Sequence, residues 1–183
     1  MRRVGQNDVG QGLRSARYGV PFGTQAQMEP TKEQQMSTHE RDQIVETLAR
    51  YGHVVDRGDL DRLDTVFTLD VRYDMSAVGL PVMIGVQALA DGAMRLGPQN
   101  PVAHHTTDVV VLEADEDEAV VESKGFMLTV EGAVRSVSHH DVLRRTAAGW
   151  RIASRTLVPQ TASLGGRLGA AAGAEEAPAR PDR

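Results

Sequence analysis

Residues 102–158 (VAHHTTDVVVLEADEDEAVVESKGFMLTVEGAVRSVSHHDVLRRTAAGWRIASRTLV) decide the fold of this chain. They contain four runs rich in β-branched and other apolar residues, separated by connections as short as Glu131-Gly132. Long runs joined in this way are typical of antiparallel hairpins. The sequence therefore predicts a four-stranded antiparallel meander, with strands at residues 102–113, 119–130, 133–145 and 150–158.

Helical patterns come before this meander. Ser37-Thr38-His39-Glu40 forms a capping box, and apolar residues then recur at helical spacing, which predicts a helix over residues 38–57. The patterns further predict a short helix at 60–66, a strand at 67–75, a loop or short strand at 79–84 and a helix at 85–96. Helices followed by a meander indicate an α+β fold. We expect a curved, cone-shaped mixed or antiparallel sheet with about three N-terminal helices on one face, and a mouth that holds a small ligand.

Composition excludes several classes of protein. The chain of 183 residues is 40% hydrophobic and 25% charged, which is ordinary for a globular domain. The absence of cysteine excludes disulfides, thiolate catalysis and cysteine–zinc sites. A net charge of −5 argues against nucleic acid as a partner. No apolar run is long enough for a membrane span or a signal core, so we expect no membrane association and a cytoplasmic location.

The composition also shifts twice along the chain. Residues 1–35 and residues 161–183 are rich in Gly, Gln, Ala or Pro and have no apolar periodicity, so we expect two flexible tails. Residues 36–160 form the predicted domain, with 12 basic and 19 acidic residues and a net charge of −7. Either Met1 or Met36 is compatible with a start of translation.

Several segments together carry a resemblance to a known family. They are residues 56–63 (DRGDLDRL), 66–71 (VFTLDV), 104–105 (HH) and 141–145 (DVLRR), with 149–152 (GWRI) and Arg155. In this order and spacing they resemble the SnoaL-like branch of the nuclear transport factor 2-like (NTF2-like) superfamily, over about residues 38–160. The resemblance implies the cone-shaped fold, and it implies chemistry that needs neither a metal nor another cofactor.

Within that superfamily, the polyketide cyclases and scytalone dehydratase suggest site residues. The resemblance to the dehydratase puts Asp56 and His104 at the positions of its acid–base pair. It puts other residues at positions that contact substrate or water, namely Val55, Met75, Thr129 and His139. Tyr51 and Tyr73 could donate a hydrogen bond to a substrate carbonyl, with core packing as the alternative.

Periodicity gives independent support for Asp56. Its position lies beside the apolar stripe of the first helix, and a carboxylate that faces the interior costs several kcal/mol unless it is paired. His104 and His105 are adjacent on a strand, so their side chains face opposite sides. Simple alternation groups His104 with Val102, Thr106, Val110 and Leu112, and His105 with Ala103, Thr107, Val109 and Val111. Both groups are apolar, and only the resemblance favours His104 as the inward residue.

The last two strands repeat this question. His139 shares a face with Val137, Asp141 and Leu143, and the resemblance favours His139 over His140 as the inward histidine. Asp141 and Arg155 are expected to form a cross-strand ion pair, and Trp150 is expected to seal the core.

The leading hypothesis is a cofactor-free enzyme with an Asp56–His104 pair in an enclosed pocket, catalysing dehydration, isomerisation or cyclisation. An aromatic content of 4% predicts an aliphatic pocket, which favours a small hydrophobic metabolite. One alternative is a non-catalytic ligand-binding or assembly module. Another is an epoxide hydrolase built on Asp56, Arg72 and Asp74. Under every alternative we expect a homodimer through the outer face of the sheet.

Overall fold

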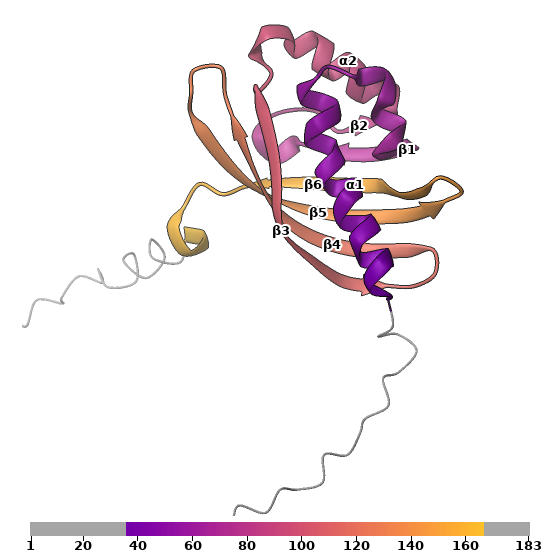
Figure 1. Cartoon of the computed structure of the whole chain (residues 1–183). Coiled ribbons are helices and arrows are strands. Elements are labelled where there is room, and N and C mark those ends of the chain that lie inside the picture. The colour runs from indigo at the N-terminus through magenta and orange to yellow at the C-terminus, as the bar shows by residue number, and fades with distance from the viewer. Residues whose placement is uncertain (1–35, 167–183) are drawn as a thin grey trace, which may run out of the picture.

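The computed structural model describes residues 36–166, which form one curved sheet with helices on its concave side (Figure 1). Chain order gives helix α1 (Thr38–Asp56), the 3₁₀ helix η2 (Leu60–Thr65), strand β1 (Phe67–Asp74), strand β2 (Met83–Ile84) and helix α2 (Val86–Leu96). Four long strands follow: β3 (Ala103–Ala114), β4 (Glu118–Leu128), β5 (Val134–Thr146) and β6 (Gly149–Pro159). Short 3₁₀ turns lie at Ser76–Val78 and Gly97–Gln99, and a turn with left-handed backbone at Leu164 and Gly165 follows β6. The predicted N-terminal tail, and most of the C-terminal one, lie outside the described residues.

The six strands are ordered β2-β1-β6-β5-β4-β3. Strands β3 to β6 form the predicted antiparallel meander. Strand β1 pairs in parallel with β6, with Tyr73 opposite Arg155, and β2 pairs antiparallel with β1. The sheet is therefore mixed and open, and the predicted α+β class and curved sheet are confirmed. The second predicted helix is a 3₁₀ helix rather than an α-helix.

Helix α1 begins and packs as its sequence predicts. The Ser37 hydroxyl accepts a hydrogen bond from the Glu40 backbone N–H, and the Glu40 carboxylate accepts one from the Ser37 N–H. Further along, the Thr47 hydroxyl donates to the Trp150 carbonyl (3.1 Å) and so ties α1 to β6. Trp150 is fully buried, with the Arg145 guanidinium 4.5 Å above its ring, so this tryptophan seals the core as expected.

A β-bulge in β3 changes which residues face the core. Asp108 has a φ of +52°, and the register between β3 and β4 shifts between Thr107 and Val110. An extra residue in one strand reverses the alternation beyond it. The inward side of β3 therefore carries His104 and Thr106 before the bulge, and Val109 and Val111 after it. The simple alternation that grouped His104 with Val110 and Leu112 is wrong, because it assumed a regular strand.

Helix α1 crosses β3 at very short range. At Gly52 an added Cβ would lie 2.4 Å from the His104 carbonyl oxygen, a separation that atoms cannot occupy without displacement. Only glycine lets the helix backbone come so close. The same crossing brings the end of α1 to the start of β3.

We predict that Gly52→Ala destabilises the domain, because the new methyl group must push α1 away from the β3 backbone. Overpacking of this kind costs about 1–3 kcal/mol in free energy of unfolding. Gly92→Ala in α2 is the matched control. Its Cβ would meet the flexible end of Met83, and alanine gains about 1 kcal/mol in helix propensity. Denaturant unfolding of both variants measures the difference, and equal stabilities would contradict the close-crossing argument.

The outer, convex face of the sheet carries exposed apolar side chains at one end. Phe126 and Leu128 on β4 lie there with Val134 on β5, and the His105 ring stacks on Phe126 with centroids 4.6 Å apart. Towards the other end, the same face is polar, with the ion pairs His140–Glu122 and Arg144–Asp70. An apolar patch beside a polar area is typical of a protein–protein contact.

We therefore expect a homodimer through this outer face, with light scattering at micromolar concentration giving twice the monomer mass. Phe126→Glu should shift the protein towards the monomer, because the new carboxylate would be desolvated in the interface. Met94→Glu, at an exposed position of α2 on the other side of the sheet, should leave the mass unchanged. A monomer mass for the protein without any substitution would refute the expectation.

Candidate functional site

The structure brings Asp56 and His104 together. Asp56 is the last residue of α1, and its Oδ1 lies 2.6 Å from the His104 Nδ1. The backbone N–H of His104 donates to Asp56 Oδ2 at 2.9 Å, so one carboxylate holds both the ring and the main chain of the histidine. The two side chains are 24% and 14% exposed, respectively. This pair is the centre of the candidate site.

The contact determines the roles of the two ring nitrogens. An ionised carboxylate only accepts hydrogen bonds, so the proton of a neutral His104 ring belongs on Nδ1. The other nitrogen, Nε2, then carries a lone pair and can take a proton from a neighbouring molecule. This is the arrangement in which a carboxylate orients a histidine base.

Two tyrosines lie beneath the pair. The Tyr51 ring meets the His104 ring edge-on, with centroids 5.5 Å apart, and the Tyr51 and Tyr73 hydroxyls are 3.4 Å apart. Both side chains are buried. Burial, and then the neighbouring Tyr73, raises the pKa of Tyr51 well above its usual value, so Tyr51 remains a neutral phenol. Both tyrosines are packed in the core and next to the pair, and a substrate contact for either one stays a prediction.

A buried ion pair lies next to the Tyr51 ring. Arg155 donates Nε and Nη2 hydrogen bonds to Asp141 (2.8 and 2.7 Å), both side chains are fully buried, and the guanidinium carbon is 4.9 Å from the Tyr51 ring centroid. Burial lowers the pKa of Arg155, but the Asp141 carboxylate more than compensates, so the pKa of this guanidinium is raised overall. The expected cross-strand pair is therefore present. Its Nη1 has no hydrogen-bond partner among the described residues, and sequence spacing gives no signal of that free donor.

His139 faces the concave side, as expected, and is buried. Its ring fits into space left by Gly125 on β4, where a Cβ would lie 2.5 Å from the ring, and its Nδ1 is 3.4 Å from the Ser123 hydroxyl. Burial, together with the nearby Arg155 charge, lowers the pKa of His139 to about 2. The ring is therefore neutral, and it contributes hydrogen-bonding capacity rather than charge.

The remaining predicted site residues are distributed around the pair. Val55 and Met75 are half-buried and pack against the core, and the Thr129 hydroxyl accepts a hydrogen bond from the Ala133 N–H within the β4–β5 turn. A substrate contact for each of these three stays a prediction. Arg72 and Asp74 pair with each other at 3.0 Å on the opposite side of β1 from the inward Tyr73. The structure does not bring them to Asp56, so the arrangement suggested for an epoxide hydrolase is not formed.

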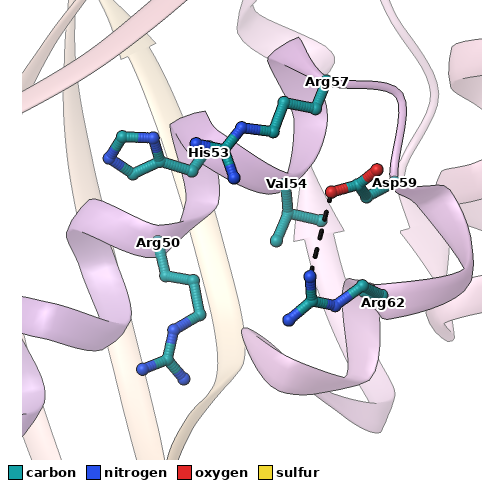
Figure 2. A pocket seen from close by; sticks show the side chains of 6 residues that line it. All are labelled: Arg50, His53, Val54, Arg57, Asp59 and Arg62. Atoms are coloured by element: carbon teal, nitrogen blue, oxygen red, sulfur yellow. Dashed lines mark ion pairs between the residues drawn. The ribbon is translucent and has the colours of Figure 1, made fainter.

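Two cavities, both wide open to solvent, lie elsewhere, along α1. One, of about 290 Å³, is lined by three arginines, His53, Val54 and Asp59 (Figure 2). The other, of about 160 Å³, lies between α1 and the β5–β6 turn. Neither is lined by Asp56 or His104. Helical spacing places Arg50, His53 and Arg57 on one side of α1. The arginine-lined cavity is nevertheless not among the sequence predictions, because it forms only where η2 approaches that side.

Within residues 36–166, no group of three or more His, Asp or Glu side chains is positioned to hold a metal ion. None of the helices there is both long enough and apolar enough to cross a bilayer.

The sequence of this chain matches a known family of protein domains. The family model of the SnoaL-like domain matches residues 36–156. No protein of curated function matches the sequence.

Solved structures with the same fold include three from Novosphingobium aromaticivorans. A candidate aromatic ring hydroxylase is 23% identical, with a TM-score of 0.59 over 70% of this chain and 94% of its own. An NTF2-like protein with a cystatin-like fold is 27% identical, with a TM-score of 0.58 over 71% of this chain and 88% of its own. A candidate scytalone dehydratase is 17% identical, with a TM-score of 0.57 over 67% and 85% of the two chains.

The buried, neutral His139 predicts a pH dependence of stability. An unfolded histidine has a pKa of about 6.5, whereas that of His139 in the folded protein is lowered to about 2. Above pH 6.5 neither state binds the proton, and stability is complete. Below that pH only the unfolded state binds it, so stability falls by up to about 1.4 kcal/mol per pH unit.

We expect His139→Asn to reduce this loss between pH 7 and pH 4, in urea unfolding followed at several pH values. The control is His140→Asn, which replaces a half-exposed histidine on the outer face and opens no space in the core. Identical slopes in the unchanged protein and the His139 variant would contradict the prediction.

Proposed function

The chain belongs to the family of SnoaL-like domains, and on this premise we propose that it is an enzyme that performs acid–base chemistry on a small hydrophobic metabolite. The observation that carries the proposal is the 2.6 Å contact between Asp56 and His104, reinforced by the hydrogen bond from the His104 backbone to the same carboxylate. A histidine held by two hydrogen bonds is pre-oriented, and pre-orientation lowers the cost of reaching the transition state.

In the proposed reaction, His104 Nε2 removes a proton from the carbon next to a substrate carbonyl, and the C–H electrons form an enolate. Asp56 stabilises the imidazolium that results. The imidazolium then returns its proton to a hydroxyl group on the β-carbon, which leaves as water while the C=C bond forms. If no leaving group is present, return of the proton to another carbon gives isomerisation instead.

The developing negative charge on the substrate oxygen needs hydrogen-bond donors. The Tyr51–Tyr73 hydroxyl pair supports this role, because one hydroxyl can donate to the other and the second O–H is then available to a carbonyl oxygen. Donors in a buried setting stabilise an oxyanion far better than donors in water. The unpartnered Nη1 of Arg155, whose guanidinium lies over the Tyr51 ring, is a further donor in the same region.

Dehydration is the form of this chemistry that we favour. A solved structure with the same fold carries the name of a scytalone dehydratase, which removes water from its substrate, as the mechanism above does. The proposed substrate class is a β-hydroxy carbonyl compound on an apolar ring system. It would enter beside the half-exposed carboxylate of Asp56.

Two probes separate proton abstraction from elimination. A nitrobenzisoxazole opens when a base removes its C–H proton, and β-hydroxyketones give conjugated enones that absorb in the ultraviolet. We expect Asp56→Asn and His104→Ala each to lower turnover by about 10²-fold or more. The double variant should be hardly slower than either single variant, because the two residues act as a unit.

The matched control is His105→Ala, since His105 is the neighbour on the same strand that faces outward. This variant should retain the activity of the unchanged protein. Losses that multiply in the double variant, or full activity in Asp56→Asn, would contradict a coupled pair.

A non-catalytic assembly module is the second candidate. The observation that favours it is the exposed apolar end of the outer sheet face, together with the position of both described cavities away from Asp56 and His104. On that alternative, substitutions at Asp56 would change stability, whereas Phe126→Glu would abolish assembly.

A further inference from the structure

The arginine-lined cavity lies on the side of α1 that faces away from the Asp56–His104 pair. Arg50, His53, Val54 and Arg57 recur at three- and four-residue spacing, so they share one side of the helix, whereas Gly52 and Asp56 lie on the other. Asp59, which precedes η2, and Arg62, which lies in η2, complete the lining. Figure 2 shows these side chains arranged around Val54 at the base of the cavity.

The charge of this cavity is opposite to that of the domain. Residues 36–160 contain 12 basic and 19 acidic residues, yet three of the 12 line this one cavity beside a single carboxylate. In a domain with more acidic than basic residues, three arginines beside one carboxylate are a local excess of positive charge. The excess makes the cavity a site of positive potential.

The guanidinium groups keep donors available. In the described part of the chain, Arg57 makes no side-chain hydrogen bond or ion pair. Arg62 forms only a long ion pair with Asp59, at 4.0 Å and so beyond hydrogen-bonding distance, and is 59% exposed (Figure 2). Arg50 binds Glu46 through Nη2, but its Nη1 makes only a long contact of 3.5 Å with the Thr65 carbonyl. A planar fork of free N–H groups matches the oxygens of a phosphate.

A fourth arginine, Arg151, adds positive charge beside this cavity. Arg151 lines the neighbouring cavity, to which Arg50 also belongs. Burial lowers the pKa of Arg151, and the nearby charge of Arg50 lowers it further. Its hydrogen bonds go to the backbone carbonyls of Asp64 and Trp150 rather than to a carboxylate. Arg50 and Arg151 repel each other although Glu46 pairs with Arg50 and Asp64 lies near Arg151, so a bound anion would be stabilising here.

We propose that this cavity binds the phosphate group of a small soluble molecule, through Arg50, Arg57 and Arg62. The volume of about 290 Å³ suits a ligand of modest size with one or two phosphates. This site is separate from the proposed acid–base pair and lies on the opposite side of the same helix, so binding here does not depend on catalysis there.

The test is a calorimetric titration of the whole chain with inorganic phosphate and with pyrophosphate, at constant ionic strength. We expect pyrophosphate to bind with a Kd of about 1 mM or tighter. Arg57→Gln combined with Arg62→Gln should weaken binding at least tenfold. The matched control is Arg72→Gln, since Arg72 is an exposed arginine on β1 that pairs with Asp74. It should bind as the unchanged protein does.

A second arm uses vesicles of phosphatidylcholine that contain phosphatidic acid, which present the same phosphate group on a membrane surface. Vesicle binding without any binding of pyrophosphate would overturn the proposal in favour of a lipid surface. Equal affinity for pyrophosphate in the double variant and the control would also overturn the proposal, because Arg57 and Arg62 would then not contribute to binding. Thermal melting of each variant confirms that it is folded before titration.

Discussion

The close crossing of α1 over β3 is the constraint on which the candidate site depends. At Gly52 the helix backbone lies so near the His104 carbonyl that no side chain fits between them. This distance lets a carboxylate as short as that of Asp56, one turn further along, reach both the ring and the backbone N–H of His104. A longer separation would require a glutamate, or a bridging water, and either would hold the imidazole less firmly. The packing of two secondary-structure elements thus determines the geometry of the acid–base pair.

The interior beneath the pair contains several polar and charged side chains. Arg155 and Asp141 are both fully buried, and they are accompanied by His139, Ser123 and the Tyr51–Tyr73 hydroxyls. A buried ion pair contributes little net stability, because desolvation offsets the attraction between the charges. An apolar core would be at least as stable. The buried Asp141–Arg155 pair is therefore no evidence of added stability.

Local features of this fold could be predicted from the sequence, and contacts between distant segments could not. The capping box at Ser37 and Glu40 and the hairpin at Glu131-Gly132 involve only neighbouring residues, so their geometry follows from residue type. The bulge at Asp108 was missed, because an aspartate tolerates a positive φ without giving a distinctive sequence signal. Family resemblance suggested Asp56 and His104, while periodicity alone left His104 and His105 equivalent. The arginine-lined cavity needs the approach of η2 to α1, which no local pattern describes.

The parallel pairing of β1 with β6 has a consequence for how the chain folds. Strand β1 lies between a two-residue strand and the last long strand, with Phe67 opposite Ile152. Contacts between residues so far apart in the sequence form late and slowly, because closing the long loop costs entropy before the strand pairing stabilises the chain. During synthesis, β1 has no long partner until β6 leaves the ribosome. A translational pause before β6 would therefore leave an apolar strand edge open to other chains, and chaperone binding should be concentrated in that interval.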